Sequence, residues 1–154
     1  VRILAYDRPE IRALRDVTRD DLAACRDRLS ETVWRRCRHV VTENARVGDA
    51  VAALVGGDLP KLGALLCASH ESLRADYEVS CAELGFLVDT GHRCGGVYGS
   101  RMMGGGFGGS TINLVHPGAV DELTAMLSDA YRVRHGKVLV GRRCAPAGGA
   151  ARVG

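Results

Sequence analysis

A run of glycines in the C-terminal half constrains this chain more than any other stretch. Five of the six residues from Gly104 to Gly109 are glycine, and the exception is Phe107. Alternating apolar residues flank the run on both sides, over residues 97–102 and 111–115. Glycine adopts backbone angles that strain other residues, and it lets a ligand approach the main chain closely. The pattern predicts a strand, a structured glycine loop and a second strand.

The sequence around this glycine run excludes two phosphate-binding motifs. Gly104-x-Gly106-x-x-Gly109 matches the dinucleotide fingerprint, but that motif must lead into a helix, and residues 110–115 are β-rich. No Lys-Ser or Lys-Thr closes the run, so it is not a P-loop. Two interpretations remain. The loop is either an anion-binding nest of backbone N–H groups or a tight structural turn packed against a neighbouring element.

Composition favours one folded domain of 154 residues, with 46% hydrophobic and 25% charged residues. A net charge of +3 and 5% aromatic residues give little reason to expect a nucleic acid or a membrane surface as partner. No apolar run approaches the roughly 20 residues of a membrane span. Six cysteines without C-x-x-C spacing, and an isolated His92-x-Cys94, predict free thiols, no metal site and a cytoplasmic protein. Because the chain begins with Val1 and its first methionine is Met102, we expect a fragment, a processed piece or a non-standard start.

Apolar residues spaced three and four apart predict helices before the glycine loop. We expect them over residues 18–29, 30–55, 58–73 and 80–91, capped by Thr18, Ser30, Asp58 and Ser80 with Glu83. The second helix should bury one stripe, formed by Val33, Cys37, Val40, Val41, Val47, Val51, Leu54 and Val55. Its Arg35, Arg36 and Arg38 should then form a solvated face. Residues 1–17 are weakly patterned and are expected to be extended or irregular.

The segment after the loop predicts a helix from Pro117 to a Gly136 cap and a last strand over residues 138–140. His70, on a predicted helix, is expected to serve packing or capping. The order of elements is helices, then strand, loop, strand, helix and strand. It predicts an α+β fold with helices packed on one face of a small antiparallel sheet.

Two stretches together resemble a known family. Residues 99–115 resemble the third, glycine-rich motif of the GHMP small-molecule kinases in its galactokinase form. Residues 69–84, which include Tyr-Glu-Val-Ser-Cys, resemble the segment that precedes this motif in galactokinases, and residues 38–44 also fit. The similarity runs from about residue 14 to residue 139.

The resemblance implies a ferredoxin-like GHMP kinase C-terminal domain over residues 18–144. Residues 1–17 would be an N-terminal extension or a remnant of an inter-domain region, and residues 145–154 a disordered tail. In the intact family this domain packs against an N-terminal GHMP domain, with the active site between them. The implied reaction transfers a phosphoryl group from ATP, with Mg²⁺, to O1 of D-galactose and gives galactose 1-phosphate and ADP.

The family's catalytic carboxylate and arginine, galactose signature and serine-rich phosphate loop belong to its N-terminal part, so no catalytic or metal-binding residue is expected here. The resemblance places one set of residues near the nucleotide phosphates: Gly104, Gly105, Gly106, Phe107, Gly108 and Gly109. Met103 stands where a threonine is usual. We therefore expect the isolated chain to be catalytically incomplete, with an open surface where the N-terminal domain would pack. The alternative is a non-enzymatic galactokinase-like sensor or binding module, or the remnant of a degraded gene.

Overall fold

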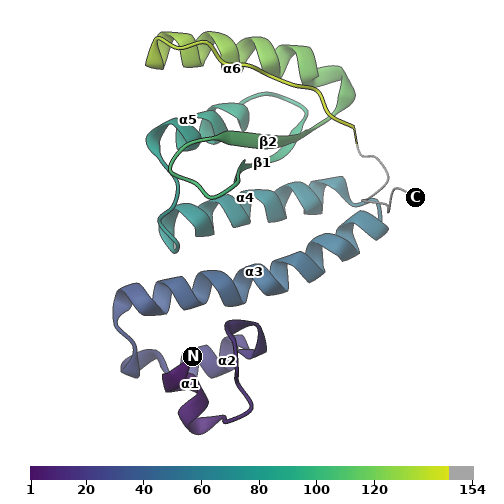
Figure 1. Cartoon of the computed structure of the whole chain (residues 1–154). Helices are drawn as coiled ribbons and strands as arrows, with labels where there is room; N and C mark the ends of the chain where they lie inside the picture. Colours follow the sequence, from purple (N-terminus) through teal and green to yellow (C-terminus); the bar gives the residue numbers. More distant parts are fainter. Residues whose placement is uncertain (146–154) are drawn as a thin grey trace, which may run out of the picture.

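The computed structural model describes residues 1–145 as a stack of layers (Figure 1). The helices α1 and α2 lie at one end, followed by α3, α4, the β1–β2 hairpin, α5 and finally α6. The helices are α1 (Arg2–Asp7), α2 (Arg19–Ala24), α3 (Glu31–Val55), α4 (Leu59–Ala75), α5 (Ala82–Gly91) and α6 (Val120–His135). The strands are β1 (Val97–Met103) and β2 (Ser110–Val115), and short 3₁₀ turns span Leu14–Asp16, Arg26–Arg28 and Pro117–Ala119. The tail predicted to be disordered lies, apart from residue 145, outside the described residues.

Most helix ends follow the predicted capping chemistry. Thr18 and Asp21 form a reciprocal capping box at the start of α2. The side chains of Ser30 and Asp58 accept hydrogen bonds from the first turns of α3 and α4. Gly136 ends α6 in the left-handed conformation, with φ 65°.

Three predictions about helix ends and local structure are wrong. The first helix ends at Ala24 rather than near residue 29, because the chain tightens into a 3₁₀ turn. Ser80 does not cap α5: Cys81 is the N-cap residue and makes no side-chain capping bond, and the Ser80 hydroxyl contacts the Cys81 carbonyl. Residues 1–17 are not wholly irregular, since they contain α1 and a 3₁₀ turn.

The first seventeen residues are ordered by packing against α3. Leu4, Ile11 and Val17 are buried in one cluster with Cys37 and Val41 of α3. Burial of each such side chain stabilises the fold by about 1.5–3 kcal/mol, which offsets weak local propensity. Scattered apolar residues gave no periodic signal, so the helix was missed.

Of the predicted continuous stripe on α3, only Cys37 and Val41, in the first half of the helix, are buried, and Val33 is 47% exposed. Beyond Val41 the stripe residues are open, with Val47 63%, Val51 55% and Leu54 60% exposed, and Val55 is 87% exposed. Ala53 is the one buried residue in that half. Periodicity marks the apolar side of a helix, but only a neighbouring element makes that side buried.

The two strands pair antiparallel, with Met103 opposite Ser110 at the loop end. One face of the hairpin packs on α5, where Met102 clusters with Leu84. The predicted third strand at residues 138–140 does not form within the described part of the chain: Val138 and Val140 are exposed, and only Leu139 packs against the α5–α6 cluster. Apolar composition alone does not produce a strand, because a strand also needs a neighbouring strand with which to pair.

Helix α4 and strand β1 cross at a contact between their backbones. A Cβ atom on Gly63 would lie 2.1 Å from the Tyr98 carbonyl oxygen, and one on Gly99 would lie 2.0 Å from the Gly63 oxygen. Real Cβ atoms do not approach that closely, so only glycine fits at both positions. The crossing places β1, and the loop that follows it, directly on α4.

A buried histidine anchors β1 further along. The Met102 N–H donates to Nδ1 of His70, on α4, at 3.3 Å. His70 is 3% exposed, and burial lowers its pKa. The prediction that His70 serves packing is confirmed, and its neutral ring holds the strand two residues before the glycine loop.

We predict opposite effects for the same substitution at two glycines. Gly63→Ala should lower the free energy of unfolding by about 3 kcal/mol, because the α4 and β1 backbones must separate. Gly48→Ala, in the exposed interior of α3 with no atom near its Cβ position, should raise it by about 1 kcal/mol. Urea unfolding followed by circular dichroism measures both. Equal effects of the two substitutions would contradict the tight crossing.

Stability should also fall on mild acidification. Burial lowers the pKa of both His39 and His70 in the folded chain, so below about pH 6.5 the unfolded chain binds more protons. The free energy of unfolding should therefore decrease as pH drops from about 7.5 to about 5.5. His70→Gln keeps an acceptor for Met102 but does not titrate, so its decrease should be smaller. If the free energy of unfolding of His70→Gln decreased as much as that of the unchanged chain, His70 would not contribute to the pH dependence.

Candidate functional site

The glycine loop has an unusual backbone. Gly104, Gly106, Gly108 and Gly109 have φ between 80° and 143°, and Phe107 has φ 59°. Non-glycine residues seldom adopt positive φ, and a bulky side chain there is strained. The glycine content of this segment is therefore required by its conformation.

One side of the loop is packed against the connection between α4 and α5. A Cβ atom on Gly106 would lie 2.1 Å from the Val79 carbonyl oxygen. The same oxygen accepts a 2.7 Å hydrogen bond from the Phe107 N–H. The structural-turn interpretation therefore describes this side of the loop correctly.

The other side of the loop is open. No atom lies within 4 Å of the Cβ positions of Gly104, Gly105 and Gly108. Across residues 1–145, the N–H groups of Gly105, Gly108 and Gly109 make no hydrogen bond to the backbone. A loop with few side chains and with N–H groups that lack backbone partners leaves room for an anion to approach the main chain. The two interpretations of the loop are thus compatible.

Three exposed apolar side chains lie in the loop or on the strands next to it. Met103 is 50%, Phe107 76% and Ile112 46% exposed. Three large apolar side chains grouped at one end of a hairpin form a surface suited to contact with another molecule or domain.

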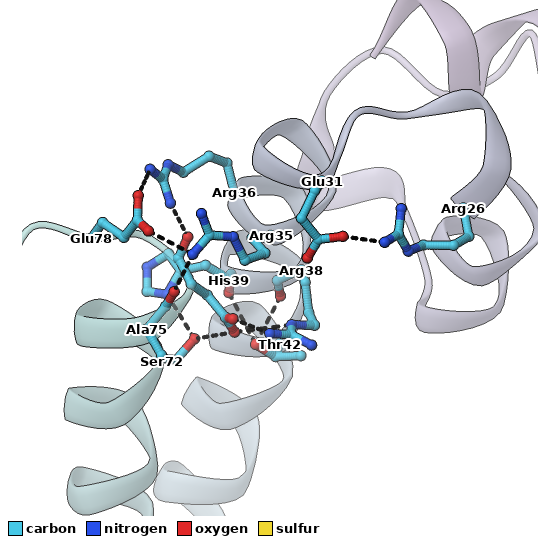
Figure 2. Close-up of polar contacts among 11 residues, drawn as sticks. Arg26, Glu31, Arg35, Arg36, Arg38, His39, Thr42, Ser72, Ala75 and Glu78 are labelled. Atoms are coloured by element: carbon cyan, nitrogen blue, oxygen red, sulfur yellow. Dashed lines mark hydrogen bonds and ion pairs between the residues drawn. The ribbon is translucent and has the colours of Figure 1, made fainter.

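The arginines of α3 bind the end of α4 and its connection to α5, as Figure 2 shows. Arg35 donates to the Ala75 carbonyl at 3.0 Å and to Glu78 at 2.6 Å. Arg36 donates to the Asp76 carbonyl and to Glu78, and Arg38 pairs with the Asp76 carboxylate. The last carbonyls of a helix lack internal partners and carry partial negative charge, so guanidinium groups stabilise them.

The prediction that these arginines form a solvated face is therefore wrong. Their side chains are only 26%, 31% and 40% exposed for Arg35, Arg36 and Arg38. The hydrogen bonds from Arg36 and Arg35 lower the pKa of Glu78, and the hydrogen bond to Asp76 raises the pKa of Arg38. The sequence of a charge cluster does not reveal which carbonyl groups, distant along the chain, its side chains bind.

A second polar layer lies beneath the arginines. Ser72 donates to the Asp76 carboxylate at 3.3 Å, and its oxygen lies 2.9 Å from Nδ1 of His39. The His39 ring stacks on Tyr77, with centroids 4.5 Å apart. This cluster was not predicted. The available signal was that residues 38–44 and 69–84 both contribute to the family resemblance.

The remaining predictions about chemistry concern cysteines, metals and membranes. All six cysteines are free thiols. Cys67 Sγ lies 3.2 Å from His92 Nε2, so His92 contacts a thiol on α4 rather than Cys94. Residues 1–145 hold no cluster of three or more metal-ligating side chains. In the same range, no helix has the length and apolarity needed to cross a bilayer.

Comparison with known proteins places this geometry in a family. Residues 50–133 match the profile described as "GHMP kinases C terminal". The chain is 49% identical to a galactokinase from Chloroflexus aggregans over 90% of its length, and 47% identical to one from Thermotoga maritima over 85%. It covers 36% of each of these relatives.

Solved structures agree with the sequence relatives. Lactococcus lactis galactokinase complexed with galactose superposes with a TM-score of 0.82 and 38% identity, over 88% of this chain and 35% of that protein. Leishmania major mevalonate kinase, at 27% identity, superposes with a TM-score of 0.55. The α+β fold class is therefore confirmed.

The chain thus spans 30–39% of the length of the galactokinases that it matches. The glycine loop lies inside the matched profile, and the galactokinases are the relatives that match most of the chain. On its fold, its sequence matches and its glycine loop, this chain belongs to the GHMP kinase family and forms a C-terminal domain of that family.

Proposed function

We propose that this chain is the C-terminal part of a galactokinase, an enzyme that phosphorylates D-galactose at O1 with ATP and releases galactose 1-phosphate and ADP. The observation that carries the proposal is the glycine loop, which is seated on Val79 and has three N–H groups that make no backbone hydrogen bond within residues 1–145. Galactokinases matching 85–99% of the chain supply the substrate class.

The loop would form one wall of the active site, near the nucleotide phosphates. Phosphoryl transfer depends mostly on positioning and on stabilising charge over the phosphate oxygens. The main chain of Gly104, Gly105, Gly106, Phe107, Gly108 and Gly109 would shape this wall without side-chain chemistry. The N–H groups of Gly105, Gly108 and Gly109 would supply donors, since that of Phe107 is bonded to Val79. ATP supplies the phosphoryl group, and bound Mg²⁺ supplies countercharge to the phosphate oxygens.

The other wall would come from an N-terminal GHMP domain. Two observations support this: the chain covers little more than a third of its relatives, and Met103, Phe107 and Ile112 leave apolar surface open beside the loop. The catalytic groups and the Mg²⁺ ligands would lie on that domain. We further propose that residues 18–144 form the C-terminal domain and that residues 1–17 are an N-terminal extension or a remnant of the inter-domain region. We also propose that the protein is cytoplasmic, which suits six free thiols.

A non-enzymatic galactose- or nucleotide-binding protein is the second candidate. The observation that favours it is Met103 at the entrance to the loop, half exposed where galactokinases usually carry threonine. A thioether is a weak acceptor and cannot donate, so one hydrogen bond beside the phosphates would be lost.

We predict that the 154-residue chain alone does not phosphorylate galactose with ATP. Joined in place of the matched C-terminal segment of the Chloroflexus aggregans galactokinase, it should restore turnover, because both walls of the site are then present. A coupled ADP-release assay with galactose measures both proteins. Turnover by the chain alone would show that the catalytic groups lie within it. A folded chimera that binds galactose and ATP without turnover would favour the binding protein.

We also predict that Gly106→Ala lowers kcat/KM of this chimera about a hundredfold, because the new methyl group pushes the loop away from Val79. Gly48→Ala, on α3 and outside the loop, is the matched control and should leave kcat/KM unchanged. The thermal midpoint of each variant separates loss of fold from loss of loop position. Full activity of the Gly106→Ala variant would contradict the proposal that the loop forms part of the active site.

A further inference from the structure

We propose that Glu78 is a positioning residue for the glycine loop: Arg35 and Arg36 hold it in a left-handed turn that aims the Val79 carbonyl at the Phe107 N–H. The relevance of this arrangement to catalysis rests on the proposed function. The contacts that support the arrangement itself all lie within residues 1–145.

Two strained residues lie on either side of one hydrogen bond. Glu78, with φ 58°, and Phe107, with φ 59°, are the non-glycine residues with positive φ in residues 1–145. Glu78 directly precedes Val79, whose carbonyl accepts the 2.7 Å bond from the Phe107 N–H. Residues in sparsely populated backbone regions persist only where their surroundings impose the conformation. Both strained residues therefore serve the same contact between the α4–α5 connection and the loop.

Hydrogen bonds to the Glu78 side chain, and to the backbone before and after it, impose the conformation of Glu78. Arg35 donates to Glu78 Oε1 at 2.6 Å, and Arg36 donates to Oε2 (Figure 2). Arg35 also donates to the Ala75 carbonyl, which fixes the start of the turn. The Val79 N–H donates to the Leu73 carbonyl at 3.1 Å, which fixes its end.

Side-chain packing does not explain the backbone conformation of Glu78, because 44% of its side chain is exposed. Its contacts are polar and directional, and they come from one rigid helix of 25 residues. The pair of charge-assisted bonds holds the carboxylate more firmly than a single surface ion pair would. Helix α3 is thereby connected through Glu78 and Val79 to the glycine loop.

The turn has little freedom to shift without moving the loop. Gly106 lies so close to the Val79 oxygen that no side chain fits between them. A change in the direction of that carbonyl therefore breaks the Phe107 bond or displaces Gly106. Loss of the Glu78 carboxylate should loosen the loop while the α4–β1 crossing stays intact.

Amide hydrogen exchange on the ¹⁵N-labelled 154-residue chain tests this inference. Glu78→Gly removes the carboxylate but accepts positive φ, so the free energy of unfolding should stay close to that of the unchanged chain. Exchange of the Phe107 amide should become about five- to tenfold faster, as expected when the support of one hydrogen bond is lost. Glu78→Ala should loosen the loop equally and also lower stability, because alanine disfavours positive φ.

Asp129→Ala is the matched control. It removes an exposed carboxylate on α6 that pairs with Arg132 at 2.8 Å and touches neither the loop nor the turn. Phe107 exchange in this variant should match that of the unchanged chain. Unchanged Phe107 exchange in a folded Glu78→Gly variant would overturn the inference.

Kinetics of the chimera described above give the catalytic readout. Glu78→Gly should lower kcat about tenfold and leave the KM for galactose unchanged, because the loop wall shifts while the sugar site is untouched. Glu78→Gln keeps an acceptor oxygen for the arginines and should recover part of the lost kcat. Faster Phe107 exchange with unchanged kcat would overturn the catalytic role. If the unsubstituted chimera has no activity, the proposed function fails, and the exchange measurement still decides whether Glu78 positions the loop.

Discussion

The backbone contact between Gly63 and Gly99 is the constraint on which the rest of the domain depends. With no side chain between them, α4 and β1 approach until carbonyl oxygens occupy the space that Cβ atoms would need. The hydrogen bond from Met102 to His70 then fixes the direction in which β1 continues. The loop after β1 therefore starts from a determined place on α4, and its conformation follows from that start.

The loop is held at a second point by the turn that follows α4. Three arginines on α3 bind the last carbonyls of α4 and the carboxylates of Asp76 and Glu78. Val79, at the end of this turn, carries the oxygen on which Gly106 and Phe107 rest. Two independent attachments thus hold a segment that has almost no side chains of its own. If the proposed function holds, main-chain donors fixed in this way would act on a phosphate without reorganisation at the moment of reaction.

Most helix caps and the glycine loop could be predicted from the sequence, because their signals come from residues close together in the chain. The Ser30 and Asp58 caps, the Gly136 stop and the strand–loop–strand at Gly104–Gly109 all depend on residues within a few positions of each other. The family resemblance predicted the fold class from a longer pattern.

Predictions that needed a distant partner failed. The apolar stripe beyond Val41 looked buried because its period was right, but all of its side chains there are more than half exposed. Arg36 and its neighbours looked solvated because their carbonyl partners lie about forty positions away along the chain. Residues 138–140 looked like a strand, but a strand requires backbone pairing as well as apolar residues, and within residues 1–145 β1 and β2 pair only with each other. The positive φ of Glu78 could not be predicted from the sequence, because glutamate is not among the residues that commonly adopt it.

The central claim is that the glycine loop faces the nucleotide phosphates. Paramagnetic relaxation tests it most directly, in the chimera with only the present chain ¹⁵N-labelled, and with galactose and Mn²⁺–ATP bound. We expect the amide signals of residues 104–109 to broaden strongly when Mn²⁺ replaces Mg²⁺, while those of Gly48 and Gly136 stay sharp. Sharp signals throughout the loop, with broadening elsewhere in the chain, would contradict it.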